Sequence, residues 1–268
     1  MLPMRTYKIL LSVLVIIVTI MGAYISFMYL YTDHMFTPIP LLAAPNPAAP
    51  SQVWTAPHVP FIHKVNTPAR ARQKDNKFGG FEVDVLSYNG KLLAAHDPSE
   101  AQRNVTLEDI FAAVQKPAQK VWWLDVKGQL TDREIDTILT LATQYNIPTE
   151  HLLFEASAGP TAKRITQKNL SLLLPLPNGF DQDHNDPEVR AKLNADVLAL
   201  WEEYHPKAVS ASFGKYAYLQ AYFPKMSKAI YYSATQRPSL KKRLMRRHLH
   251  RDPSVHIFMT DEYDWINL

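Results

Sequence analysis

Cysteine is absent from the 268-residue sequence, which excludes disulfide bonds, thiolate metal sites and cysteine nucleophiles and leaves the redox compartment open. Glycine is scarce, with 8 residues, and they form neither a G-x-G-x-x-G nor a Walker phosphate loop. A G-x-S-x-G elbow is also missing, which argues against serine hydrolase chemistry. The net charge of +4 is too small for a typical nucleic-acid binder, so no nucleic-acid partner is expected.

The remaining composition is that of a globular protein with a substantial core. Apolar residues make up 47% of the chain and charged residues 20%. The length suits one large domain or two small ones. The small positive charge is compatible with an anionic membrane surface or a phosphate-bearing substrate.

The N-terminal segment is apolar over a long stretch. Residues 9–32 contain no charged side chain, and about 20 apolar residues suffice to cross a bilayer. Arg5 and Lys8 precede the segment and Asp33 follows it. The positive-inside rule therefore predicts a single-pass anchor, with residues 1–8 in the cytoplasm and the rest periplasmic or extracellular.

Two other interpretations of this segment are weaker. A cleaved signal peptide would have an apolar region of about 7–15 residues and a small-residue cleavage site. Here the run is longer and ends in bulky side chains such as Phe27 and Tyr31. A buried core helix is disfavoured because the segment is apolar on every face.

The next segment, residues 33–58, is rich in proline. Prolines at 38, 40, 45, 47, 50 and 57 prevent a regular helix or a central strand, so this segment is expected to be a semi-rigid linker. We therefore expect the folded domain to occupy residues 59–268.

Short apolar runs alternate with helical patterns throughout this domain. Several runs are almost continuously apolar, as in parallel strands covered on both faces. The turn signal Tyr88-Asn89-Gly90 makes the third run the second arm of a hairpin, which leaves eight strands for the main sheet. The expected strands are 59–65, 80–86, 91–96, 121–127, 151–157, 170–176, 207–212, 228–234 and 255–261.

Helix start signals lie between these runs. Thr131 and Glu134 form a capping box, and Thr106 precedes a helix with acidic residues in its first turn. Pro187 and Pro238 occupy first-turn positions of two further helices. Eight strands alternating with helices predict an α/β fold of the TIM-type (β/α)8 barrel class. An open doubly wound sheet is the alternative, but no glycine-rich loop supports it.

Charged side chains occur with strand parity inside two apolar runs. Glu82 and Asp84 are two residues apart, as are Asp125 and Lys127, so each pair shares one face of its strand. Three carboxylates at one barrel mouth would repel each other unless a hard cation such as Mg²⁺ or Ca²⁺ neutralised them. Lys127 would then contact a phosphate.

Two histidines end neighbouring apolar runs. His63 ends the first run and His96 ends the hairpin arm. Histidine titrates near neutral pH, so the pair could supply a general acid and a general base.

With these residues, the chain resembles the phospholipase-C-like phosphodiesterase superfamily, which includes glycerophosphodiester phosphodiesterases and spider-venom-type phospholipases D. Locally it is most similar to the menorin family, whose motifs match HKVNT (63–67), EVDV (82–85), AHDP (95–98), TLE (106–108) and LDVK (124–127). Beyond residue 127, only the strand–helix rhythm and TDEYD (260–264) agree with the superfamily.

The resemblance implies specific roles. Glu82, Asp84 and Asp125 would hold Mg²⁺ or Ca²⁺, and Lys127 would touch the phosphate. One of His63 and His96 would attack or activate a hydroxyl while the other protonates the leaving oxygen. The glycerophosphodiester enzymes usually have His-Arg-Gly at the first strand, whereas this chain has His63-Lys64-Val65, which leaves the substrate open.

Several other residues have two interpretations each. Glu155 either contacts substrate or forms a salt bridge at the barrel rim, while Ser210, Ser212 and Trp265 could shape a pocket. A basic helix is either a solvated outer helix or a contact for anionic headgroups. Its cations are Lys241, Lys242, Arg243, Arg246, Arg247 and Arg251.

Together these features predict a membrane-anchored, metal-dependent phosphodiesterase that acts on a phospholipid headgroup or another phosphodiester. A catalytically silent ligand-binding or scaffolding barrel is the first alternative. A glycosidase is a second, because it also needs two carboxylates, but Glu82 and Asp84 on one strand suit a metal better. The oligomeric state is left open.

Overall fold

The computed structural model describes residues 4–36, 59–177, 186–232, 249 and 251–260. Residues 37–58 of the expected linker lie outside this range, and so do Pro238, the basic residues 241–247 and Trp265. Four of the five residues of TDEYD, 261–264, also lie outside it.

Eight parallel strands form a closed barrel, as the sequence predicted. The sheet order is β1-β9-β8-β7-β6-β5-β4-β2-β3, and an additional β1–β2 pairing closes the ring. The short strand β3 stands outside the ring and pairs antiparallel with β2. The strands are β1 (Phe61–Ile62), β2 (Gly80–Tyr88), β3 (Lys91–Ala94), β4 (Val121–Lys127), β5 (Leu152–Glu155), β6 (Ser171–Pro175), β7 (Ala208–Ser212), β8 (Lys228–Tyr232) and β9 (Val255–Thr260).

The predicted hairpin joins β2 and β3. Asn89 and Gly90 have φ values of 50° and 72°, the left-handed region that a type I′ turn requires at both central positions. This turn places the end of β3, and the loop that carries His96, beside β2.

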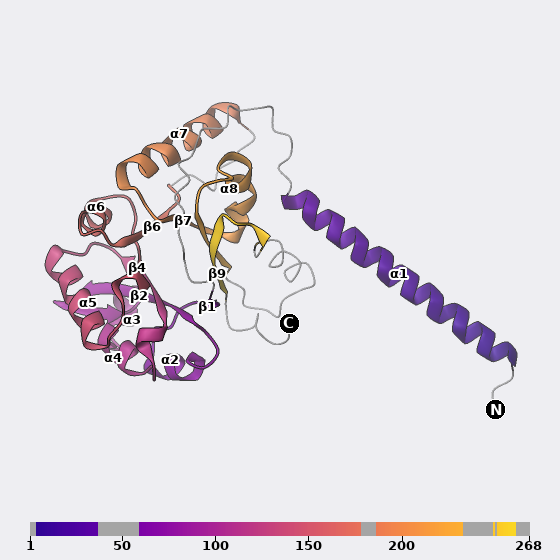
Figure 1. The fold of residues 1–268 in the computed structure, drawn as a ribbon, viewed down its shortest axis with the longest axis horizontal. Coiled ribbons are helices and arrows are strands. Elements are labelled where there is room, and N and C mark those ends of the chain that lie inside the picture. The colour runs from indigo at the N-terminus through magenta and orange to yellow at the C-terminus, as the bar shows by residue number, and fades with distance from the viewer. Residues whose placement is uncertain (1–3, 37–58, 178–185, 233–248, 250, 261–268) are drawn as a thin grey trace.

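Helices surround the strands (Figure 1). Their starts follow the sequence signals: Thr106 and Thr131 form capping boxes with Asp109 and Glu134, and Asp186 caps the helix that begins at Pro187. The barrel helices are α2 (Pro68–Lys74), α3 (Pro98–Ala101), α4 (Leu107–Ala112), α5 (Asp132–Gln144), α6 (Pro160–Gln167), α7 (Pro187–Tyr204) and α8 (Tyr216–Tyr222). Short 3₁₀ turns occupy Pro117–Gln119, Thr149–His151 and Phe213–Lys215.

The core has two layers because strand residues alternate between the faces of the barrel. Outward-facing residues such as Phe81 and Val83 pack against the helices. Inward-facing apolar residues fill the barrel interior away from the carboxyl ends of the strands, and Phe61 and Trp123 meet edge to face there. Toward the carboxyl ends of the strands the interior carries buried polar side chains such as Glu82, Asp84 and Ser210.

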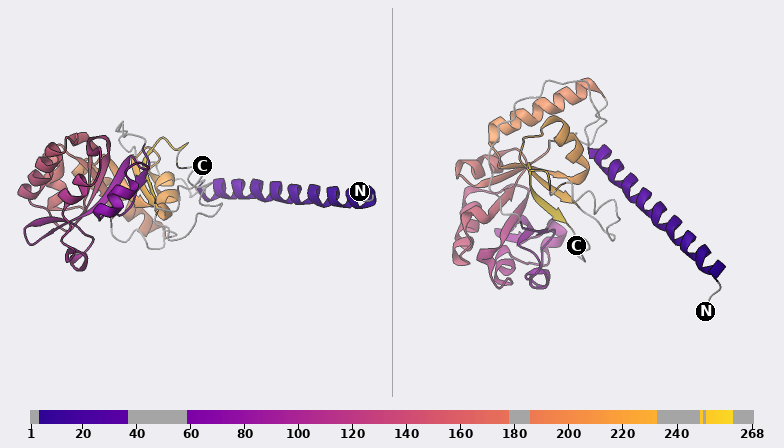
Figure 2. Two further views of the ribbon diagram at one scale, coloured as in Figure 1. Left: turned by 90° about the horizontal axis from the view of Figure 1, so that it is seen from below. Right: turned by 45° about the vertical axis from the view of Figure 1, so that its right-hand side comes forward.

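The N-terminal helix α1 (Met4–Phe36) extends away from the barrel in Figures 1 and 2, and it contacts α8. Its apolar side chains between Leu11 and Phe27 are exposed. Within the described residues, no helix has both the length and the apolar character needed to cross a membrane. The transmembrane segment expected at residues 9–32 is thus not shown and stays a prediction.

Candidate active site

The predicted acidic residues meet at the carboxyl ends of two adjacent strands. The parallel register of β2 and β4 places Asp84 opposite Asp125 and Glu82 opposite Trp123. Because alternate residues face the barrel interior, Glu82, Asp84 and Asp125 all point inward. Their ligand oxygens lie within 4.8 Å of one another. The carboxyl ends of the strands carry the active sites of barrel enzymes.

Asp84 is buried and held by a side chain from another segment. The Nδ2 of Asn66 donates to Oδ2 of Asp84 at 2.5 Å, and the backbone N–H of Asp84 donates to Oδ1 of Asn66 at 3.0 Å. Asn66 follows β1 and is itself buried. This reciprocal pair fixes the orientation of the carboxylate, and sequence reasoning assigned no role to Asn66.

Glu82 and Asp84 are the two most deeply buried acids of the site. The backbone N–H of Lys64, which has a left-handed φ of 58°, donates to its Oε2, and Nε2 of His63 lies 3.8 Å from the same oxygen. The other oxygen, Oε1, is buried without a hydrogen-bond partner in the described structure. Burial raises the pKa of Glu82, and the negative charges of Asp84 and Asp125 add to this effect.

Lys127 links the two strands electrostatically. Its Nζ lies 2.9 Å from Oδ1 of Asp84 and 2.5 Å from Oδ2 of Asp125. Burial lowers the pKa of Lys127, but the two carboxylates outweigh burial and raise it overall, so the ammonium stays charged. Burial raises the pKa of Asp125 despite the opposing charge of Lys127.

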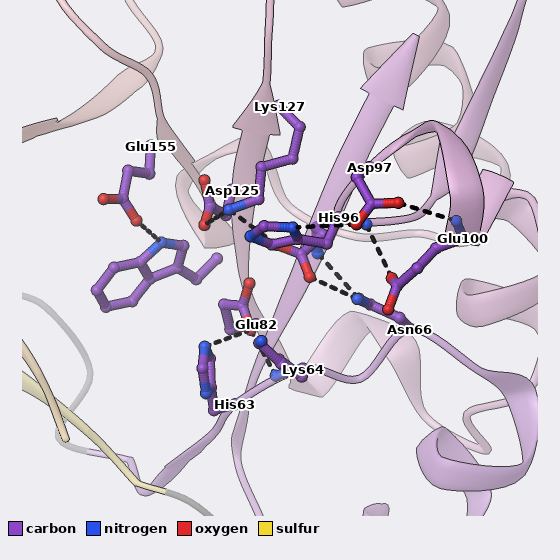
Figure 3. A network of polar contacts seen from close by, with 12 residues as sticks. His63, Lys64, Asn66, Glu82, His96, Asp97, Glu100, Asp125, Lys127 and Glu155 are labelled. Atoms are coloured by element: carbon purple, nitrogen blue, oxygen red, sulfur yellow. Dashed lines mark hydrogen bonds and ion pairs between the residues drawn. The ribbon is translucent and has the colours of Figure 1, made fainter. Parts of the chain in front are cut away.

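His63 lies beside the acidic cluster at the end of β1 (Figure 3). Its backbone N–H donates to the carbonyl of Thr260 at 3.2 Å, and its own carbonyl accepts from Nη2 of Arg70 at 3.0 Å. The imidazole is 17% exposed, so a substrate in the barrel mouth can reach it. The structure thus brings His63 together with the three predicted metal ligands.

His96 has a different setting at the rim of the barrel. Its side chain is 50% exposed, and Nδ1 lies 3.8 Å from Oδ2 of Asp97. Its backbone N–H donates to Glu100. These polar contacts stay within residues 96–100, which include the first residues of α3, so the role of His96 as the second acid or base stays a prediction.

Glu155 ends β5 and faces Asp125 across the β4–β5 pairing. The Nε1 of Trp123 donates to Oε2 of Glu155 at 2.7 Å (Figure 3). The Oγ of Ser210 donates to Oε1 at 2.5 Å. Burial and the charge of Asp125 raise the pKa of Glu155 to about 7. Among the described residues Glu155 has hydrogen bonds to Trp123 and Ser210 and no salt bridge, and its role as a substrate contact stays a prediction.

The donor set fits a hard divalent cation. The three carboxylates are all oxygen ligands, as Mg²⁺ and Ca²⁺ prefer, and a cation would offset their mutual repulsion. The buried Oε1 of Glu82 lacks a partner, and a bound cation would supply one. Lys127 neutralises only part of the charge, because three carboxylates and one ammonium leave a net negative site.

Comparison with known proteins establishes the fold. No protein-family model matches the chain, and no curated protein matches it either, so the menorin resemblance stays a prediction. A glycerophosphodiester phosphodiesterase from Parabacteroides distasonis is similar in structure, with a TM-score of 0.50 and 9% identity over 76% of this chain and 92% of that one. An orotidine 5′-monophosphate decarboxylase from Sulfolobus solfataricus is similar with a TM-score of 0.42 and 11% identity over 74% and 86% of the two chains.

Proposed function

We propose that the protein is a metal-dependent phosphodiesterase whose substrate phosphate binds at the mouth of the barrel. The observation that carries this proposal is the cluster of Glu82, Asp84 and Asp125 with Lys127 at its edge and His63 beside it. The barrel of the Parabacteroides protein, which is a glycerophosphodiester phosphodiesterase, supports the same reaction class.

The positive groups of the site would recognise the phosphate. A bound Mg²⁺ or Ca²⁺ supplies Lewis acidity and charge neutralisation at the phosphoryl oxygens. Lys127 contributes a fixed ammonium that is held between Asp84 and Asp125 and is partly exposed toward the mouth. An ammonium at this position stabilises the negative charge that develops on the phosphoryl oxygens in the transition state.

His63 would transfer protons at the phosphorus centre. Its Nε2 lies 3.8 Å from Oε2 of Glu82, beside the proposed metal ligands. Histidine is the side chain most often used for proton transfer near neutral pH. In the proposed reaction one histidine takes the proton of the attacking hydroxyl or water, and the other gives a proton to the leaving oxygen. We assign His63 and His96 to this pair.

The substrate would be a phospholipid headgroup or another phosphodiester outside the cytoplasm. The exposed apolar side chains of α1 support a membrane anchor, which would keep the barrel close to lipid substrates. Flotation of the full chain with phospholipid vesicles tests the anchor. Loss of flotation on deletion of residues 1–36 is expected, and unchanged flotation would contradict it.

The test of the reaction is hydrolysis of bis(p-nitrophenyl) phosphate by the full chain, with and without Mg²⁺ or Ca²⁺. We expect metal-dependent release that His63→Ala abolishes while the circular dichroism spectrum is unchanged. Glu82→Gln and Asp125→Asn should abolish metal binding in calorimetry. Glu202→Gln is the matched control, because Glu202 is exposed on α7.

Unchanged metal affinity in both carboxylate variants would contradict the proposal. A folded, metal-binding protein that releases no product from any phosphodiester would favour the ligand-binding barrel instead.

A further inference from the structure

Glu155 lies one strand beyond the proposed metal ligands. The registers place Asp84, Asp125 and Glu155 in one row across β2, β4 and β5. Adjacent strands are about 4.8 Å apart. A short chemical linker would therefore be enough to join a group bound at Glu155 to a phosphate held near Asp125. Glu155 is partly exposed, which lets a ligand in the mouth reach it.

Two neutral donors fix the orientation of this carboxylate. Trp123 donates to one oxygen and Ser210 to the other, from β4 on one side and β7 further around the barrel. A carboxylate oxygen can accept two hydrogen bonds, so each oxygen keeps capacity for a further donor. Glu155 is therefore preorganised to accept hydrogen bonds and is not saturated.

In the part of the chain that the structure describes, the charge of Glu155 has no cationic partner. Among the described residues Glu155 forms no salt bridge. Lys127 is the cation that lowers its pKa, but the Lys127 ammonium is already paired with Asp84 and Asp125. A largely buried carboxylate with neutral partners and a like-charged neighbour is costly in free energy, although part of Glu155 stays exposed to the mouth. A cationic donor from a ligand would offset this cost more fully than a hydroxyl would.

We propose that Glu155 is a specificity residue that accepts hydrogen bonds from a primary ammonium on the alcohol of the substrate. This inference rests on the proposed function, since it takes the phosphate to lie at the metal site. The substrate class is phosphodiesters of a short amino alcohol, with the ammonium at Glu155. Trp123 and Ser210 are positioning residues for the carboxylate.

The test compares three p-nitrophenyl phosphodiesters with the full chain in Mg²⁺: the ethyl, 2-aminoethyl and 2-(trimethylammonio)ethyl esters. The trimethyl ester carries the charge but cannot donate a hydrogen bond. We expect kcat/KM for the aminoethyl ester to exceed both others by roughly 10- to 100-fold, the range for one hydrogen bond to a charged group. Glu155→Gln should reduce the ratio of aminoethyl to ethyl to about 1.

Two further variants separate recognition from structure. Ser210→Ala should lower the aminoethyl preference less than Glu155→Gln does, because Trp123 still holds one oxygen. Glu202→Gln makes the same chemical change at an exposed position of α7 and should keep the full preference. Equal rates for aminoethyl and trimethyl esters, or a preference that survives Glu155→Gln, would overturn the inference.

A binding measurement keeps the inference testable if no ester is hydrolysed. Calorimetry would compare O-phosphoethanolamine with ethyl phosphate in Mg²⁺, for the unmodified chain and Glu155→Gln. Tighter binding of phosphoethanolamine that the variant loses would support the subsite even if the protein is not a phosphodiesterase. Equal affinity for both ligands would overturn it.

Discussion

Asn66 shows how one amide can organise the candidate metal site. It donates to the Asp84 carboxylate and accepts from the backbone N–H of the same residue. It therefore holds both the Asp84 side chain and the backbone of β2 at this position. Residues that orient metal ligands in this way typically contribute 10- to 100-fold to metal affinity.

We therefore predict that Asn66→Ala weakens Mg²⁺ or Ca²⁺ binding by roughly 10- to 100-fold, measured by calorimetry. The cause is a mobile Asp84 carboxylate and a backbone N–H that has lost its acceptor. Gln144→Ala removes an exposed amide on α5 and serves as the control. An affinity within twofold of the unmodified chain would show that Asn66 does not position the site.

The raised pKa of Glu155 predicts that the free energy of unfolding depends on pH. Its pKa of about 7 in the folded chain lies above its ordinary value of 4.5, so between these pH values the folded state binds more protons than the unfolded state. Stability from this group is therefore present below about pH 4.5 and is lost as pH rises through about 7.

The measurement is urea denaturation at pH 5, 6, 7 and 8 in the presence of a chelator. Relative to Glu155→Gln, the unmodified chain should lose of the order of 3 kcal/mol of unfolding free energy across this window. The Glu202→Gln variant should follow the unmodified chain at every pH. A difference between the chain and Glu155→Gln that does not vary with pH would disprove this prediction.

At the scale of elements, the start of β8 depends on a buried lysine. Lys228 is 0% exposed, and its Nζ donates to the carbonyls of Phe223 and Met226, both at 2.9 Å, and to Oγ of Ser254 at 2.7 Å. These contacts tie β8 to the end of α8 and to the residue before β9. Burial lowers the pKa of Lys228 to about 8.

Lys228→Met keeps the apolar stem but removes the donor for these buried acceptors. We expect the unfolding free energy to fall by about 3 kcal/mol, since each unsatisfied buried polar group costs about 1–3 kcal/mol. Lys225→Met, at an exposed position three residues earlier, should change stability by less than about 0.5 kcal/mol. Equal stabilities of the two variants in urea denaturation would contradict the role of Lys228.

At the scale of the molecule, the barrel is closed by its shortest strand. β1 has two residues, and it pairs with β9 on one side and with β2 on the other. Phe61 of β1 fills the interior, where a Cβ at Gly80 would lie 2.5 Å from its ring. The closure therefore requires glycine at the start of β2.

Gly80→Ala should push the Phe61 ring out of place and lower the unfolding free energy by about 1–3 kcal/mol, the usual cost of overpacking. Thermal denaturation followed by circular dichroism would measure the change. Gly214→Ala is a suitable control, because its added Cβ would meet only Ser212 Oγ, at 3.9 Å. Equal melting temperatures for the two variants would show that β1 closes the barrel without this close approach.

Local sequence patterns predicted the strands, the helix starts and the faces of the strands. Local periodicity, the Asn89-Gly90 turn and the threonine caps depend on neighbours within a few residues, so they can be read without a structure. Strand parity also placed Glu82, Asp84 and Asp125 on the interior face, where they meet.

The partners of individual side chains could not be predicted from these local patterns. Parity gives the face of a strand but not the distance across the barrel, so it could not pair Ser210 with Glu155, 55 residues away. It could not show that Asn66 bonds Asp84, or that Lys228 is buried. These contacts depend on the register and closure of the barrel, which are set by all eight strands packing together.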